Sequence, residues 1–308
     1  MTATPAQPIR VFQVATGNLG TEMIKRIGQH PDLQLVGLHC YTPPEKVGRD
    51  AGEIVGIGPV GVTATGTVEE IIAAEPDVLT FHGVFPPDED LYVRVLEAGI
   101  NIVTTADWIT GWHRDTNHPH PSGKPVSQLL EDACRRGGST FYGTGMNPGV
   151  NQILGVVCSA DVAEIENVTT IESVDVSCHH SRDTWIEVGY GQPVDDPEIP
   201  GKLEKYTRVF ADSVLMMADC FDLQLDEVKF SYELGACTKD VDLGWYQLPK
   251  GGSLGGNYIK YQGMVDGVPR VETHLEWQMT PAHRPPAGTS RAATSPRSRV
   301  TRVSTTST

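Results

Sequence analysis

The chain has 308 residues, enough for two domains, and its 24 Lys and Arg against 39 Asp and Glu give a formal charge of −15. This acidic balance argues against nucleic acid or an anionic membrane as the main partner. No stretch approaches the roughly 20 apolar residues of a membrane span, the N-terminus has no secretory pattern, and the six cysteines are scattered, so we expect a reduced cytoplasmic protein.

Residues 9 to about 145 alternate short β-type runs with helical patterns. We expect strands at 9–15, 33–39, 78–81, 100–104 and 140–142, and helices at 19–28, 68–74, 88–98 and 125–136. Thr67 is a suitable N-cap for the helix at 68–74, and Gly137-Gly138 a suitable end for the last one. This alternation predicts an α/β domain of Rossmann type, a doubly wound parallel sheet with helices on both faces.

The region after about residue 147 has a different pattern. Long alternating runs predict strands at 168–178, 228–237, 257–265 and 271–279, and only 202–219 predicts a long helix. This pattern favours a C-terminal α+β domain with a mainly antiparallel sheet that has one covered face. The open face favours a homodimer. At the boundary, Asn147 is expected to be the N-cap of a helix whose first residue is Pro148.

The two ends of the chain are not expected to join either domain. Residues 281–308 hold no aromatic or acidic residue and five arginines among Ser, Thr, Pro and Ala. Such a segment buries too little apolar area to offset its ordering entropy, so we expect a disordered tail. The chain therefore divides into a flexible N-terminus (1–8), a dinucleotide-binding domain (9–146), a substrate and oligomerisation domain (147–280) and this tail (281–308).

The segment Ala15–Gly20, with the sequence ATGNLG, carries the strongest chemical signal. It follows the first expected strand and opens the first expected helix. A glycine without Cβ lets the backbone approach a pyrophosphate, and a helix N-terminus offers unpaired N–H groups and a positive dipole end. Ala15 replaces the first glycine of the usual fingerprint, and the alternative is an ordinary glycine turn. The expected phosphate-binding residues are Thr16, Gly17, Asn18, Leu19 and Gly20.

The end of the second expected strand bears on which dinucleotide binds. It reads His39-Cys40-Tyr41-Thr42, without the carboxylate that usually holds a ribose 2′-OH in NAD sites. Lys46 and Arg49 follow in the next loop. We therefore expect NADP, with NAD as the alternative, and assign His39 and Tyr41 to cofactor binding. If the two cations are only solvated loop residues, this preference disappears.

Three motifs together resemble the dihydrodipicolinate reductase superfamily. They are the turn at 15–20, KVGRDAGE at 46–53 and TGMNPG at 144–149. Over about residues 9–280 the chain is most similar to the branch that contains 2,4-diaminopentanoate dehydrogenase and the native amine dehydrogenases, including actinobacterial members of unassigned substrate. The resemblance implies that the nicotinamide lies between the two domains. It also implies hydride transfer at a C=N or C–N carbon of a small amine, ketone or imine.

Further cofactor residues follow from strand ends and from the resemblance. Ligands bind at the carboxyl ends of the strands in open α/β sheets. On this ground we assign the residues that follow or end two expected strands: Phe81, His82, Gly83, Thr104, Thr105 and Ala106. The resemblance implies that Asn147 faces the nicotinamide.

The candidates for proton transfer lie where the chain departs from its apparent relatives. Amine dehydrogenases of this branch use a glutamate after the fifth strand, where this chain has Asp107. Dihydrodipicolinate reductases proper carry a His-His-Arg-His-Lys stretch, whereas Ser177–Thr184 contains no lysine. We expect Asp107, with His179 or His180, to handle protons. The alternatives are a solvated loop aspartate and one surface and one core histidine.

Two other functions remain open from the sequence. One is 4-hydroxy-tetrahydrodipicolinate reduction, which the missing lysine argues against. The other is a truncated homologue that binds the nucleotide without catalysis. The histidines of one loop, His113, His118 and His120, lack a cysteine or glutamate that would complete a tetrahedral set, so no metal is expected.

Overall fold

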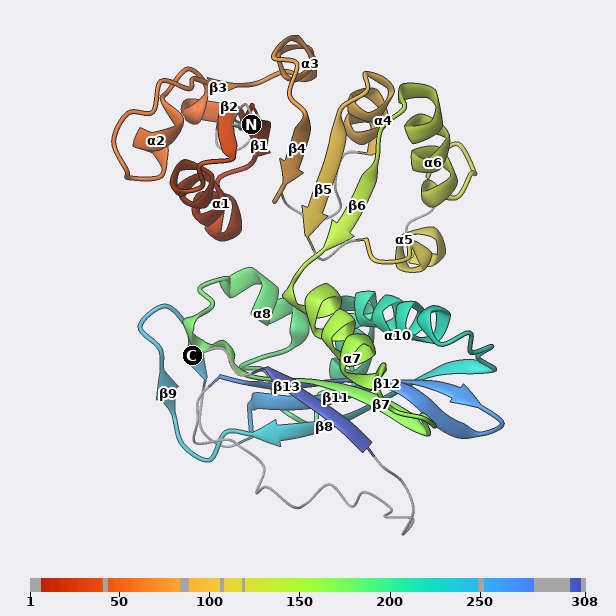
Figure 1. The fold of residues 1–308 in the computed structure, drawn as a ribbon. Helices are drawn as coiled ribbons and strands as arrows, with labels where there is room; N and C mark the ends of the chain where they lie inside the picture. The colour runs from red at the N-terminus through yellow and green to blue at the C-terminus, as the bar shows by residue number, and fades with distance from the viewer. Residues whose placement is uncertain are drawn as a thin grey trace. The chain divides into compact units, whose positions relative to one another are not determined.

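The computed structural model describes residues 7–40, 44–83, 89–105, 108–117, 120–248 and 252–279, and the backbone of 300–305. The chain divides into an N-terminal unit, Met1–Gly145, and a C-terminal unit, Met146–Thr308 (Figure 1). Among the helices in these ranges, none is both long and apolar enough to cross a membrane.

The N-terminal unit is built on a parallel sheet in the order β3-β2-β1-β4-β5-β6 (Figure 1). Its strands are β1 (Ile9–Val14), β2 (Leu33–His39), β3 (Ala64–Thr65), β4 (Val78–Phe81), β5 (Asn101–Thr105) and β6 (Phe141–Thr144). Its helices are α1 (Asn18–Gln29), α2 (Ala51–Ile54), α3 (Val68–Ala73), α4 (Glu89–Glu97), α5 (Trp112–Asn117) and α6 (Val126–Gly137), with a 3-10 turn at Pro44–Lys46. The predicted Rossmann-type, doubly wound fold is confirmed.

Local sequence signals explain why these helices begin and end where they do. Thr67 caps α3 in a capping box with Glu70, and Gly138 ends α6 in the left-handed conformation. Apolar side chains of α3, α4 and α6 pack with β1, β4 and β5 in one core cluster. A second cluster joins α1 and α2 to β2 and β3. The sheet is thus held by two cores, and its carboxyl edge remains available for a site.

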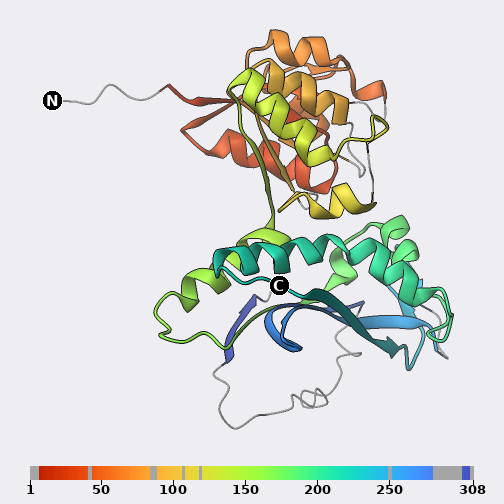
Figure 2. The same ribbon diagram turned by 90° about the vertical axis from the view of Figure 1, so that its right-hand side faces the viewer.

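The C-terminal unit has a five-stranded sheet in the order β13-β7-β12-β11-β8. Its strands are β7 (Asn167–Asp175), β8 (Glu227–Ala236), β11 (Leu254–Val265), β12 (Val268–Gln278) and β13 (Val300–Thr305), and a separate hairpin joins β9 (Val241–Asp242) to β10 (Gln247–Leu248). Its helices are α7 (Asn151–Ser159), α8 (Arg182–Val188), α9 (Ile199–Thr207) and α10 (Val209–Cys220). Helices α7 and α10 lie on one face of the sheet (Figure 2).

This sheet is mixed, where the sequence predicts a mainly antiparallel one. β11 pairs antiparallel with β8 and β12, but β7 pairs parallel with β12 and with β13. The chain leaves β7 through α8, α9 and α10 before it returns to the sheet, and such a long crossover allows parallel pairing. The expected helix at 202–219 is also two helices, which meet at Arg208.

The tail contains an element that composition does not predict. Residues 281–299 and 306–308 lie outside the described residues, but Val300–Thr305 pairs with β7. The reason is local: this segment is rich in β-branched Val and Thr, and an edge strand offers unpaired backbone groups whatever the composition of the added strand.

Two expectations about where elements of the C-terminal unit begin and end are wrong. β7 ends at Asp175 because the Asp175 carboxylate accepts a hydrogen bond from Ser177 N (2.9 Å) and turns the chain into the 3-10 segment Val176–Cys178. His179 and His180 therefore follow a helical turn and not a strand. Likewise, Asn147 is extended (φ −155°, ψ 116°) and does not cap a helix, since α7 begins only at Asn151.

Candidate active site

The predicted phosphate turn lies at the carboxyl edge of the N-terminal sheet. Val14, the last residue of β1, pairs with His39 of β2 on one side and with Phe81 of β4 on the other. The turn is anchored where Ala15 N donates to His39 O (2.9 Å). Three strand ends thus meet beside the turn, which is the position in which open α/β sheets bind ligands.

The two glycines of the turn are required for different reasons. A Cβ added at Gly20 would lie 2.2 Å from the carbonyl oxygen of Ala15, so the fold itself demands glycine there. Gly17 has an ordinary φ of −71°, and a Cβ added to it would meet nothing within 4 Å. Nothing among the described residues of this unit accounts for a glycine at position 17. The empty space beside it fits a group that approaches the backbone from outside.

The first turn of α1 also differs from its neighbours in how its N–H groups are satisfied. Gly17 is the N-cap of α1, and in the part of the chain that the structure describes no side chain caps this helix. In contrast, Asp50 caps α2 by accepting from Gly52 N and Glu53 N, and the Thr67 hydroxyl caps α3. The unpaired N–H groups of α1 and its positive dipole end suit a phosphate.

A buried glutamine, Gln13, which the sequence motifs do not include, forms a hydrogen bond to the backbone of the turn. Gln13 is fully buried; its Nε2 donates to Ala15 O (3.0 Å), and its Oε1 accepts from the Thr80 hydroxyl (2.7 Å). The same Nε2 lies 3.2 Å from Nδ1 of His82. The available signal was a polar residue inside the apolar run VFQVA.

This contact bears on the tautomer of His82. When the Gln13 Nε2 donates to His82, Nδ1 of the ring accepts and the ring proton is on Nε2. Burial lowers the pKa of His82, so the ring stays neutral at physiological pH. His82 can therefore present one N–H donor at the end of β4.

A lysine lies against the turn. Lys46 Nζ donates to the Thr16 hydroxyl (2.8 Å). Glu70, whose charge acts on His39 at the end of β2, is held by the Thr67 hydroxyl (2.6 Å) and by Thr67 N (3.1 Å). A cation thus lies beside the end of β2, whereas the Glu70 carboxylate is engaged in hydrogen bonds that cap α3.

The residues of the motif KVGRDAGE (46–53) shape the loop that carries Lys46. The Asp50 carboxylate accepts hydrogen bonds from Val60 N (3.0 Å), Gly61 N (2.7 Å) and Gly52 N (2.8 Å). These bonds hold the pKa of Asp50 below its usual value. The motif therefore shapes a loop and positions Lys46.

The structure places the other expected cofactor residues unevenly. Tyr41, Ala106 and Asp107 lie outside the described residues. The side chain of Phe81 is buried in the core against Tyr92, so only its backbone faces the site. The hydroxyl of Thr104 is buried and makes no hydrogen bond in the described ranges, whereas Thr105 and Gly83 are partly exposed at their strand ends.

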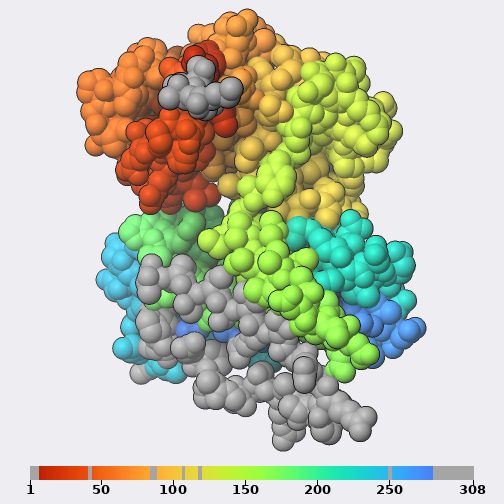
Figure 3. Space-filling model, viewed as in Figure 1, coloured from red at the N-terminus to blue at the C-terminus, as the bar shows by residue number. Residues whose placement is uncertain are grey.

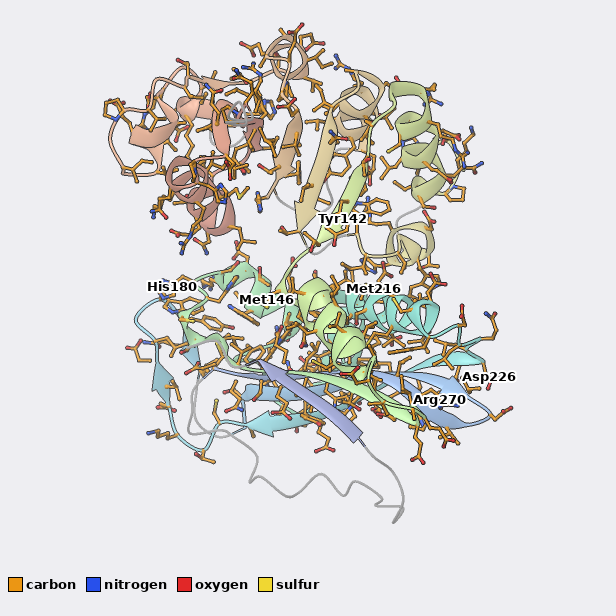
Figure 4. All side chains as sticks on the ribbon, in the orientation of Figure 1. Tyr142, Met146, His180, Met216, Asp226 and Arg270 are labelled. Atoms are coloured by element: carbon orange, nitrogen blue, oxygen red, sulfur yellow. The ribbon has the colours of Figure 1, made fainter. Side chains whose placement is uncertain are left out.

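The three candidates in the C-terminal unit separate into two environments. The His179 ring packs edge-on against Trp185, and burial lowers its pKa. His180 packs on Trp245 and lies beside α8 (Figure 4). Asn147 is held elsewhere, by the side chain of Gln152 on α7 (2.8 Å). Among the described residues, no group of three or more His, Cys, Asp or Glu could hold a metal ion.

The uncapped helix and the space at Gly17 are features of dinucleotide-binding sites of Rossmann type, and a cation lies beside them at Thr16. Residues 13–81 match the family described as dihydrodipicolinate reductase, N-terminus. An amine dehydrogenase of Streptomyces virginiae is 30% identical over 269 residues, which are 83% of this chain and 71% of that protein. The 4-hydroxy-tetrahydrodipicolinate reductase of Methanothermobacter thermautotrophicus is 27% identical over 55% of this chain and 58% of its own length.

Solved structures agree with this fold. The amine dehydrogenase of Mycobacterium smegmatis has a TM-score of 0.69 at 16% identity, over 88% of this chain and 79% of its own. GenD2 from gentamicin A biosynthesis, solved in complex with NAD, has a TM-score of 0.51 at 11% identity, over 90% of this chain and 67% of its own. The chain is an NAD(P)-dependent oxidoreductase. It belongs to the family of the Streptomyces amine dehydrogenase within the dihydrodipicolinate reductase superfamily, as the three motifs predict.

Proposed function

We propose that this oxidoreductase transfers hydride to or from the carbon of a C=N or C–N bond, as an imine reductase or amine dehydrogenase, with NADP as its cofactor. The observation that carries the proposal is the space beside Gly17 at an uncapped helix. The amine dehydrogenase at 30% identity supports the choice of substrate group: a small amine, ketone or imine.

Each part of the turn has a role in this proposal. When bound, the nicotinamide cofactor supplies or accepts the hydride. The N–H groups of Asn18, Leu19 and Gly20 hold the diphosphate, and Gly17 leaves room for it. His82 donates from Nε2 towards the nicotinamide end, where Thr104 and Thr105 also lie. Asp107 and His179 or His180 remain predictions for proton transfer, and homodimer formation and a cytoplasmic location also remain predictions.

The preference for NADP rests on the surroundings of the end of β2. The Lys46 ammonium beside Thr16 can pair with a ribose 2′-phosphate. NAD sites instead hold the free 2′-OH with a carboxylate. Glu70 is engaged with Thr67 and so is not available for that role.

A pair of valine substitutions tests the nucleotide site. Gly17→Val places a side chain in the space for the diphosphate, and we expect NADPH affinity to fall by at least about 100-fold with an unchanged unfolding midpoint. Gly28→Val is the matched control, because Gly28 is exposed in the same helix and an added Cβ meets nothing within 4 Å. Equal NADPH affinity of the two variants by calorimetry would refute the site.

A turnover assay then tests the reaction. We expect NADPH-dependent reduction of cyclic imines and of ketones in the presence of ammonia, and no reduction of 4-hydroxy-tetrahydrodipicolinate. Reduction of that substrate alone would assign the protein to lysine biosynthesis. NADPH binding without turnover of any member of the panel would favour the inactive homologue.

A further inference from the structure

Glu172 is a carboxyl group in the C-terminal unit that neither the motifs nor the expected site includes. It lies in β7, two residues from Thr170, so both side chains are on the same face of the sheet. The Thr170 hydroxyl accepts from Gln152 of α7 (3.1 Å), which identifies this as the face that α7 covers. The indole N–H of Trp277 donates to Glu172 Oε1 (2.5 Å).

The surroundings of Glu172 favour its neutral form. Burial raises the pKa of Glu172, and the hydrogen bonds that Glu172 forms with Trp277 and with the Asn147 side chain offset this only in part. The residue is still partly exposed. A carboxyl group of this kind keeps its proton to a higher pH than an ordinary glutamate and can act as an acid.

A second carboxyl group of the same sheet shows that burial alone does not produce this state. Glu272 of β12 is also buried, and burial would raise its pKa. His274 (3.0 Å), Gln262 (2.7 Å) and Asn167 (2.9 Å) donate hydrogen bonds to it and lower the pKa instead. Glu172 has fewer such donors. The two side chains are the same chemical group, and the direction of the pKa shift differs because their hydrogen-bond partners differ.

The Asn147 amide lies beside Glu172. Gln152 Nε2 donates to Asn147 Oδ1 (2.8 Å) and so fixes the orientation of this amide. The Asn147 Nδ2 is buried, and its side chain forms a hydrogen bond that lowers the pKa of Glu172. One acidic O–H and one fixed N–H donor thus lie together next to the indole of Trp277, which Trp185 and Phe210 support edge-on. Such a set suits a tetrahedral carbon that carries a hydroxyl and an amino group and has an apolar substituent.

We infer that Glu172 is the acid that expels water when a ketone and ammonia form an iminium ion in this enzyme. This inference rests on the proposed function. In the step, the Glu172 proton passes to the hydroxyl of the carbinolamine, the C–O bond breaks, and the nitrogen lone pair forms the C=N bond. The products are water, the iminium cation and the Glu172 carboxylate, so charge and atoms balance. Asn147 Nδ2 donates to the departing oxygen and positions it.

Two substrates that differ only in this step test the inference. A preformed cyclic imine needs no loss of water, whereas a ketone with ammonia does. For Glu172→Gln we expect ketone amination to fall by at least about 100-fold and imine reduction to change by less than about threefold, with NADPH affinity unchanged. Glu272→Gln is the matched control, and we expect it to affect the two reactions equally.

The outcomes distinguish failure of the role of Glu172 from failure of the proposed function. If the wild type converts both substrates and Glu172→Gln converts both as well as the wild type, or loses both equally, the role of Glu172 is wrong and the proposed function stands. If the wild type converts neither substrate while it binds NADPH, the proposed function fails and the role of Glu172 fails with it. Thermal unfolding of both variants identifies a loss of fold.

Discussion

Two glycine-containing turns in this chain each lead from a strand into a helix. We call them the open turn (15–20) and the closed turn (146–150), because side chains of the described residues pair with a backbone N–H only in the second. The turn at 15–20 leaves the first N–H groups of α1 without a capping side chain. In the segment Met146–Val150 before α7, the Gln152 side chain instead accepts from Gly149 N (2.8 Å) and donates to Asn147 Oδ1 (2.8 Å). In sequence both segments resemble family motifs, but only in the second does a side chain of the following helix pair with a backbone N–H of the turn.

The difference teaches that a glycine turn can offer backbone donors to a ligand only where side chains of its own chain leave them unpaired. Gln152 is fully buried and also reaches Thr170 and Thr273 on two strands. This network stabilises the segment and orients Asn147. At the first turn, the buried Gln13 supports the carbonyl side and leaves the N–H side free. The following substitutions test this comparison.

We expect the largest effect from Gly20→Ala. The new Cβ would lie 2.2 Å from Ala15 O, and the backbone must move to remove this contact. The expected loss of stability is about 3 kcal/mol, with NADPH binding lost as well. Urea unfolding of the protein followed by fluorescence measures it. Gly28→Ala is the control in the same helix; it should be stabilising by roughly 0.5–1 kcal/mol, because alanine is the better helix former. Similar stability of both variants would show that the turn adapts.

Gln152→Leu tests the closed turn. It removes the partners of Gly149 N and Asn147 Oδ1 in a buried place, and we expect a loss of about 2 kcal/mol in the free energy of unfolding. Gln224→Leu is the control, since Gln224 is exposed, and it should change stability by less than about 0.5 kcal/mol. A loss no greater than that of the control would mean that water satisfies the turn.

Lys46→Met tests the cation beside the open turn. We expect the Kd for NADPH to rise about tenfold and the Kd for NADH to change little, because only NADPH carries the 2′-phosphate. Calorimetry with both cofactors measures the difference. Lys25→Met removes a cation of α1 that pairs with Glu22 (2.8 Å) and should leave both affinities unchanged. Equal weakening of both cofactors by Lys46→Met would assign Lys46 to the diphosphate.

The smallest effect is expected from Ala15→Gly. Ala15 has φ +70°, in the left-handed region where a Cβ costs about 1 kcal/mol or more. Glycine relieves this cost but loses more chain entropy, so the expected net gain in stability is about 0.5 kcal/mol. Ala73→Gly, at an exposed helical position of α3, should have the opposite sign. A loss of stability in both variants would show that Ala15 is not strained.

Features that depend on neighbouring residues were predictable from the sequence. The strands at 33–39 and 78–81, the Thr67 cap and the glycine turn all follow from periodicity and capping chemistry within a few residues. The sequence did not predict the end of β7, although its cause is also local. A single Asp side chain that caps a 3-10 turn ends the strand, whereas the alternating pattern by itself predicts that the strand continues. α7 also does not follow the apolar periodicity of a helix, because it buries Asn151 and Gln152 and exposes Leu154 and Val157. Atoms of this yellow-green part of the chain lie on the visible face in Figure 3.

By itself, the sequence determined the N-terminal fold, the glycine turn after β1 and the family, because contiguous residues carry those signals. Only the tertiary structure decided which backbone donors pair with side chains, which carboxyl group has a raised pKa and how β7 pairs. Glu172 and Trp277 are 105 residues apart in the chain and meet only because β7 and β12 are neighbours in the sheet. The pKa of a buried group depends on such distant neighbours, and no local pattern records them.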